Sequence, residues 1–178
     1  MVNSLTLKLT LPTPELEQAY LDYVKEWEQN GEKISPFSID PQGLDFKTWL
    51  EASESIRRQE TCPPNLVPAD TYFLIDNAGR ILGAINIRHR LNDWLLNFGG
   101  HIGYGVRPSE REKGHATLML KLALEKCREL GLEKVLLTCD KENTASVRII
   151  NANCGVLENE MPDGERTMLR YWIVLGEL

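Results

Sequence analysis

The residues with the clearest chemical potential form one continuous stretch, Arg107–Thr117. It lies between the apolar segment 102–106 and a run with helical periodicity. A strand that ends in a glycine-containing turn at a helix start presents several N–H groups that lack intrahelical acceptors. The helix dipole adds partial positive charge at the same point, and Arg107, Arg111 and Lys113 add full charges. We therefore expect this turn to hold a phosphorylated ligand.

The hydrophobic periodicity of the chain predicts the elements that position this turn. We expect strands at 5–11, 72–75, 80–88, 101–107, 135–139, 156–160 and 167–175, and helices at 16–31, 46–58, 113–130 and 143–153. The strand–helix–strand unit 101–139 should be a right-handed crossover with its two strands parallel. The pattern favours one α+β domain over residues 1–178, in which helices flank a mixed central β-sheet.

The composition excludes several classes of protein. The 178 residues carry a formal net charge of −6, which argues against general affinity for nucleic acid or for an anionic membrane. The negative charge is compatible with a cationic substrate such as an amine, although a negative surface more often serves only to keep a protein in solution. No apolar run is long enough to span a bilayer, and we see no signal peptide. The four cysteines are widely spaced and contain no CxxC pair, so we expect a reduced, cytoplasmic protein.

The phosphate-binding turn and its flanks resemble a known family. The residues Arg111-Glu112-Lys113-Gly114-His115-Ala116 are similar to the Arg/Gln-x-x-Gly-x-Gly/Ala signature of the Gcn5-related N-acetyltransferases (GNAT). The preceding strand, the long helix, the strand 135–139 and the following Asn143-Thr144-Ala145-Ser146 agree with that family in order. The motif region 101–155 carries nearly all of the resemblance, and the N-terminal half agrees only in the order of its elements.

The resemblance implies that acetyl-coenzyme A (acetyl-CoA) is the cosubstrate. By family analogy the main-chain N–H groups of Arg111, Glu112, Lys113, Gly114, His115, Ala116 and Thr117 would bind the pyrophosphate. Gly114 would allow close approach because it lacks a Cβ. The main chain of Val106 would pair with the pantetheine amides like an added strand. Asn143, with Ser146 in the same motif, would contact the pantetheine arm, and Asn143 is equally suited to be a simple N-cap.

Two positions depart from the family pattern. Glu112 stands where relatives often have glycine or a basic residue, and a carboxylate there would repel phosphate unless it points to solvent or pairs with a neighbouring cation. Ile150 stands seven positions after Asn143, where many relatives carry the tyrosine that protonates the departing thiolate. The usual general acid is therefore missing from this chain.

The sequence offers candidates for the general base but does not single one out. His101 precedes the cofactor motif and has a suitable unperturbed pKa, but a structural histidine in a sheet is an equal alternative. Asp140 ends the strand 135–139, at the edge where α/β-type sites gather, although a turn or capping role is the commoner one. Tyr104 could donate a proton, His115 suits the phosphates better, and His89 has no supporting context.

The acceptor is expected between residues 31–69 and the loop 92–98. Its apolar tip, Trp94-Leu95-Leu96, would cover the acceptor, form a contact in a homodimer or pack into the core. The leading hypothesis is an acetyl-CoA-dependent N-acetyltransferase whose acceptor is a primary amine on a small molecule or a peptide. A non-catalytic acyl-CoA-binding module or sensor is the alternative that the missing tyrosine keeps open. A nucleotide-binding P-loop fits poorly, and no residues have metal-ligand spacing.

Overall fold

A computed structural model describes residues 6–176 of the protein. Its strands are β1 (Lys8–Thr10), β2 (Ala69–Ile75), β3 (Ile81–Arg88), β4 (Ile102–Val106), β5 (Lys134–Asp140), β6 (Val156–Asp163) and β7 (Arg166–Val174). Its α-helices are α1 (Glu17–Gln29), α2 (Phe46–Ile56), α3 (His115–Glu129) and α4 (Thr144–Ala152). Short 3-10 turns lie at Pro14–Leu16, Phe37–Ile39 and Pro108–Glu110, and a π-helical turn at Leu95–Gly99.

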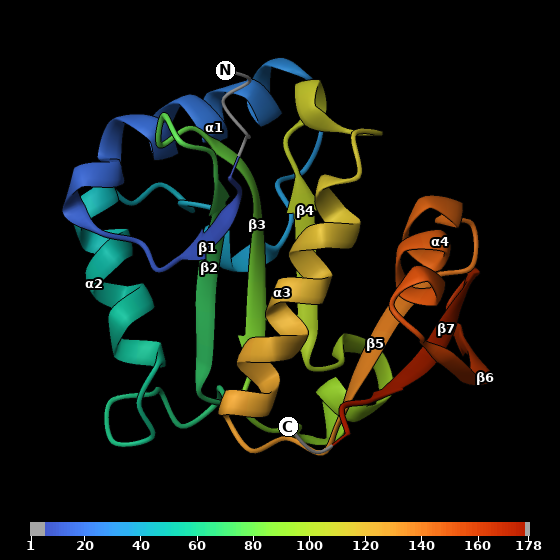
Figure 1. Ribbon diagram of the computed structural model, residues 1–178. Helices are drawn as coiled ribbons and strands as arrows, with labels where there is room; N and C mark the ends of the chain where they lie inside the picture. Colours follow the sequence, from blue (N-terminus) through green and yellow to red (C-terminus); the bar gives the residue numbers. More distant parts are fainter. Residues whose placement is uncertain (1–5, 177–178) are drawn as a thin grey trace.

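The strands form two sheets with the orders β1-β2-β3-β4 and β5-β7-β6, and every ladder among the described residues is antiparallel. Helix α3 packs against one face of the first sheet, in front of β3 and β4 in Figure 1. Helices α1 and α2 cover the other face of the same sheet. The α+β domain with a sheet flanked by helices is thereby confirmed.

Strands β4 and β5 run in the same direction, because α3 carries the chain back between them (Figure 1). They touch only at one end, where the His101 N–H donates to the Leu136 carbonyl at 2.7 Å and the Thr138 hydroxyl donates to the Phe98 carbonyl at 2.6 Å. Beyond that point the strands diverge, so they are parallel as expected but do not pair as a ladder. The divergence leaves one edge of β4 without a strand partner among residues 6–176.

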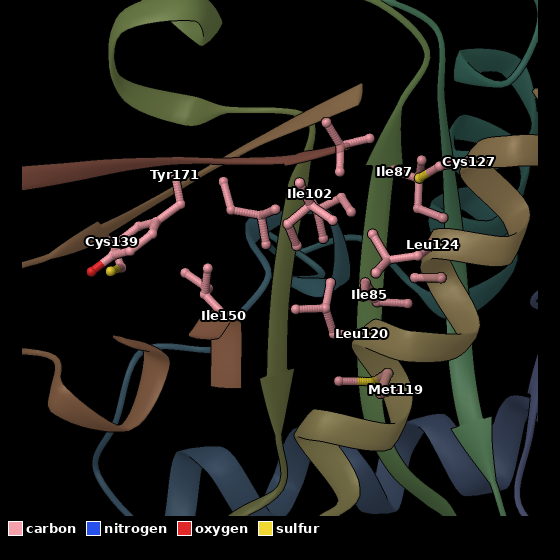
Figure 2. Packing of buried hydrophobic residues seen from close by; sticks show 14 of the residues in the cluster. Ile85, Ile87, Ile102, Met119, Leu120, Leu124, Cys127, Cys139, Ile150 and Tyr171 are labelled. Atoms are coloured by element: carbon pink, nitrogen blue, oxygen red, sulfur yellow. The ribbon is translucent and has the colours of Figure 1, made fainter. Parts of the chain in front are cut away.

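Two apolar clusters hold these layers together. The larger one joins α3, α4 and both sheets, and Figure 2 shows Ile150 of α4 pointing into it beside Cys139 and Tyr171. The smaller one is aromatic and lies under α1 and α2, where the rings of Tyr20 and Trp49 stack with centroids 4.4 Å apart. Burial of such large side chains is the main stabilising contribution to this architecture.

Most predicted elements are present, with boundaries shifted by a few residues. The N-terminal strand is confirmed only at Lys8–Thr10, and Leu5 lies outside the described residues. The apolar tip of the loop 92–98 is divided: Leu95 is buried, whereas Trp94 and Leu96 are exposed. Within residues 6–176, none of the helices combines the length and the apolar character needed to cross a bilayer.

Candidate active site

The divergence of β4 and β5 opens into a cleft of about 640 Å³. One wall is the end of β4, the opposite wall is the first turns of α4, and the mouth is formed by the turn before α3 and by the segment after α1. The lining residues are Trp27, Glu32, Lys33, Ser35, Tyr104, Gly105, Val106, Glu110, Arg111, Glu112, Gly114, His115, Ala116, Thr117, Asn143, Ala145, Ser146, Arg148 and Ile149. The cleft therefore gathers every cofactor residue predicted from the sequence except Lys113.

The main chain of residues 112–117 offers a row of free donors to this cleft. Within the described part of the chain, none of these six N–H groups has a protein acceptor at hydrogen-bond distance, while the Leu118 N–H closes the first helical bond to the Gly114 carbonyl at 3.1 Å. Glu112 and Gly114 both have positive φ angles, 61° and 80°. Such left-handed residues between right-handed ones turn successive N–H groups toward one point, which creates an anion-binding concavity. The Arg111 N–H, which was also predicted to bind the pyrophosphate, instead donates to the Pro108 carbonyl at 3.4 Å, so the concavity is limited to residues 112–117.

The basic side chains around this turn do not face the cleft as free charges. Arg107 is buried, and its guanidinium donates to Asp22 at 2.9 Å, to Glu26 at 2.6 Å and to the Ile81 carbonyl at 3.0 Å. It ties the end of β4 to α1, so the expectation that its charge serves the phosphate is wrong. Burial is the largest single effect on the pKa of Arg107 and lowers it. The Glu26 and Asp22 carboxylates together outweigh burial and raise the pKa above its ordinary value.

Arg111 and Lys113 are also paired. Arg111 binds both carboxylate oxygens of Glu32 at 2.8 and 2.6 Å, donates to the Val106 carbonyl at 3.2 Å and lies over the Trp27 ring. Lys113 donates to Glu110 at 2.9 Å.

Glu110 lies beside three basic side chains. Besides Lys113 it pairs with Arg80, and His115 Nε2 lies 3.4 Å from the same carboxylate. Hydrogen bonding from Arg80, followed by that from Lys113, lowers the pKa of Glu110 to about 2. The positive character of the turn therefore comes mainly from its main chain.

The free edge of β4 forms the inner wall of the cleft. The Arg88 N–H donates to the His101 carbonyl and the Arg107 N–H to the Leu82 carbonyl, so the odd-numbered main-chain groups of β4 face β3. By the alternation of a strand, the N–H groups of Tyr104 and Val106 point the other way, toward the opening.

The segment after α1 packs against the same stretch of β4. The Ser35 hydroxyl donates to the Tyr104 carbonyl at 3.0 Å. A Cβ at Gly105 would come within 2.2 Å of the Ser35 carbonyl oxygen, so only glycine permits this approach. The close contact brings a part of the chain some seventy residues away in sequence onto the cleft wall.

The opposite wall begins at the N-terminus of α4. Asn143 is its N-cap, and its side-chain oxygen accepts from the Ser146 N–H at 3.0 Å. The Ser146 hydroxyl lies 2.7 Å from the phenolic oxygen of Tyr104. Ile150 is fully buried, and its methyl group lies 2.3 Å from the position that a Cβ on Gly155 would take (Figure 2 shows Ile150). The side chain at position 150 therefore packs into the core and does not line the cleft.

The two candidate bases lie outside the cleft lining. His101 is buried, its Nδ1 accepts from the Leu136 N–H at 2.9 Å, and burial together with the Arg88 charge lowers the pKa of His101 to about 4. The Asp140 carboxylate accepts from the Glu142 N–H at 2.9 Å and so shapes the turn into α4. These contacts favour structural roles for both residues. Neither His101 nor Asp140 lines the cleft.

Sequence patterns did not identify the residues that α1 and the segment after it add to the cleft. Trp27, Glu32, Lys33 and Ser35 occur in an ordinary amphipathic helix and a loop, and only the tertiary fold places them opposite α3. Trp27 Nε1 is the one buried side-chain donor without a partner among the described residues. The described residues contain no group of three or more potential metal ligands, and all four cysteines are free.

The family is shown by comparison with known proteins. The Acetyltransferase (GNAT) family model matches residues 16–156, so the chain belongs to this family, whose members use acetyl-CoA as cosubstrate. A search of curated protein sequences gave no significant match.

Solved structures agree on the fold. The proposed acetyltransferase yncA of Salmonella typhimurium, solved with acetyl-CoA, has 14% identity and a TM-score of 0.64, with 97% of this chain and 95% of that chain covered. The Salmonella typhimurium acetyltransferase that modifies the N-terminal serine of ribosomal protein L7/L12 has 14% identity and a TM-score of 0.66, with 95% of each chain covered. A proposed phosphinothricin N-acetyltransferase has 15% identity and a TM-score of 0.61, with 97% of this chain and 100% of that chain covered. The acceptors named for two of these proteins, a ribosomal protein and phosphinothricin, differ although the fold is shared.

Proposed function

We propose that the protein is an N-acetyltransferase that transfers the acetyl group of acetyl-CoA to a primary amine by direct attack. The acceptor amine belongs to a small molecule or a peptide. The observation that carries the proposal is the row of six unpaired N–H groups at 112–117, set at the mouth of a cleft with a free strand edge. Family membership supplies the cosubstrate that fits both features.

The cleft divides into parts that suit different portions of the cosubstrate. The main chain of residues 112–117 suits the diphosphate, which helix N-termini and concavities of N–H groups bind well. The Val106 N–H on the free edge of β4 suits a pantetheine amide, in the manner of an added strand. Asn143 and Ser146 border the same path from the α4 side. The Glu112 carboxylate is unfavourable in this arrangement, whereas Glu32 and Glu110, which also line the cleft, are paired with basic side chains.

The amine must lose its proton before it attacks. A lysine-like amine has a pKa of about 10.4, so only on the order of one molecule in two thousand is neutral at pH 7. A base, or water leading to one, would raise the rate by roughly 10²–10⁴-fold. His101 and Asp140 stay predictions for this role; His101 would have to act with a pKa near 4 and with Nδ1 already bonded.

Three further expectations stay predictions. They are a single acetyltransferase domain over residues 1–178, a homodimer that uses the exposed Trp94 and Leu96, and residence in the cytoplasm. The four free cysteines support the last of these.

Calorimetry and a transfer assay together test the proposed function. Purified protein should bind CoA and acetyl-CoA, and an amine panel should identify at least one acceptor that releases free CoA thiol from acetyl-CoA. The panel should include amino acids, polyamines and peptides with free N-termini. Tight binding without release for every amine would instead indicate the non-catalytic acyl-CoA-binding module. Absence of any binding would refute both.

A further inference from the structure

Tyr104 crosses the cleft from one wall to the other. It belongs to β4, and its phenolic oxygen lies 2.7 Å from the Ser146 hydroxyl in the first turn of α4. Both residues line the cleft. Among the described residues this is the only hydrogen bond of the phenol. A tyrosine that served packing alone would not need to place its polar end between these two walls.

The pairing leaves one hydroxyl proton available. Two hydroxyls that share one hydrogen bond contribute two protons, and only one of them lies between the oxygens. When Ser146 donates to Tyr104, the phenolic O–H is free to donate to a third partner in the cleft, and the bond that it accepts strengthens it as a donor. Burial raises the pKa of Tyr104 to about 12, so the phenol keeps its proton throughout the physiological range.

The position of the phenol follows the proposed path of the cosubstrate. Tyr104 is two residues further from the phosphate-binding turn than Val106, about 7 Å along the strand. Beyond Tyr104 the cleft ends where His101 and Leu136 join β4 to β5. A chain that starts at the diphosphate and runs along the edge of β4 therefore reaches Tyr104 near its far end, which in acetyl-CoA carries the thioester.

We infer that the Tyr104 hydroxyl donates a hydrogen bond to the thioester sulfur and stabilises the thiolate as it leaves. The inference rests on the proposed function. The amine nitrogen forms the new bond to the acetyl carbon, the carbon–sulfur bond breaks, and the sulfur keeps its electron pair. The proton of the amine passes to water, and CoA leaves as a thiolate bonded to Tyr104. Because Ile150 fills the usual tyrosine position, the donor in this chain comes from β4 and not from α4.

The acidity of bound CoA tests this inference without any acceptor. A hydrogen bond to a charged group stabilises it by about 1.5–3 kcal/mol, which corresponds to a pKa difference of roughly one to two units. The thiol of CoA labelled with ¹³C next to the sulfur should titrate one to two pH units lower on the wild-type protein than on Tyr104→Phe. Ser146→Ala, which keeps the phenol but removes its hydroxyl partner, should give a smaller shift.

Tyr72→Phe is the matched control. Tyr72 packs on the same apolar cluster, and burial raises its pKa to about 12 as well, but it does not line the cleft. Its substitution should leave the pKa of the bound thiol unchanged. Equal thiol pKa values on wild type and on folded Tyr104→Phe would overturn the inference, even if both transfer acetyl groups.

Kinetics separate this inference from the proposed function. With an active acceptor, Tyr104→Phe should lower kcat about 10- to 100-fold and change the Kd of acetyl-CoA less than twofold. A wild-type protein that binds acetyl-CoA but never releases CoA contradicts the proposed function alone, because the thiol titration still reports whether Tyr104 reaches the sulfur. An active wild type with an equally active Tyr104→Phe contradicts this inference alone.

Discussion

Two glycines at the ends of α3 provide a paired test of the phosphate-binding turn. Gly114 has φ 80° and Gly131 has φ 76°, and a Cβ added at either would meet no atom within 4 Å. Alanine should therefore cost the same at both positions. A left-handed conformation costs a residue with a Cβ about 1–2 kcal/mol, so both variants should lose that much of the free energy of unfolding in urea.

Only one of the two positions faces the cleft. The Gly114 N–H belongs to the row of free donors, whereas Gly131 already donates to the Arg128 carbonyl at 2.9 Å. Distortion that removes one charge-assisted hydrogen bond to phosphate costs about 1.5–3 kcal/mol, which weakens CoA binding by about 10- to 100-fold or more. Gly114→Ala should show that loss by calorimetry, and Gly131→Ala should bind CoA as the wild type does.

Ligand-linked stability checks the same point in one experiment. At a CoA concentration of 100 times the wild-type Kd, wild type and Gly131→Ala should each gain about 2.7 kcal/mol of unfolding free energy. Gly114→Ala, with a Kd about 100-fold higher, should gain only about 0.4 kcal/mol. If both alanine variants gain the full amount, CoA does not use this turn, and the reasoning is refuted.

Three other perturbations follow from the contacts of the site. Glu112→Gln removes a like charge from the turn and should tighten CoA binding about two- to fivefold at low salt, with the gain fading in calorimetry at 1 M salt. Glu32→Gln frees Arg111 for the phosphates and should also tighten CoA binding, whereas Glu129→Gln, which removes an exposed ion pair at the far end of α3, should not. His101 has a folded-state pKa of about 4, below the unfolded value of about 6.5, so the unfolded state binds the proton first and stability falls as the pH drops through this window. His101→Gln should flatten that part of the urea-unfolding profile by up to about 3 kcal/mol, and a slope unchanged from wild type would contradict the burial of a neutral ring.

Local patterns predicted what depends on neighbours in sequence. The Asn143 cap and the left-handed Gly131 are both where the sequence indicates them, because capping and left-handed turns are properties of a few adjacent residues. The divergence of β4 and β5 was not predictable in this way, since an apolar run looks the same whether its strand has a partner or not. The contribution of Glu32 and Ser35 to the cleft depends on tertiary contacts with residues 79 and 69 positions away in sequence.

The charged side chains near the turn are less available to a ligand than their number in the sequence indicates. Arg107, Arg111 and Lys113 indicate an anion site by their number, yet each is paired with a carboxylate, and Arg107 serves the fold. The main-chain N–H groups therefore remain available to a phosphate. A side chain could occupy them only by entering the cleft. Main-chain donors stay available in a protein whose net charge is −6. The affinity of such a site for CoA should depend less on salt concentration than the affinity of a site with three unpaired basic side chains. The residues that set the backbone conformation of this turn, Glu112 and Gly114, lie among these charges in the sequence, so the sequence predicts the position of the turn although the charges themselves are paired.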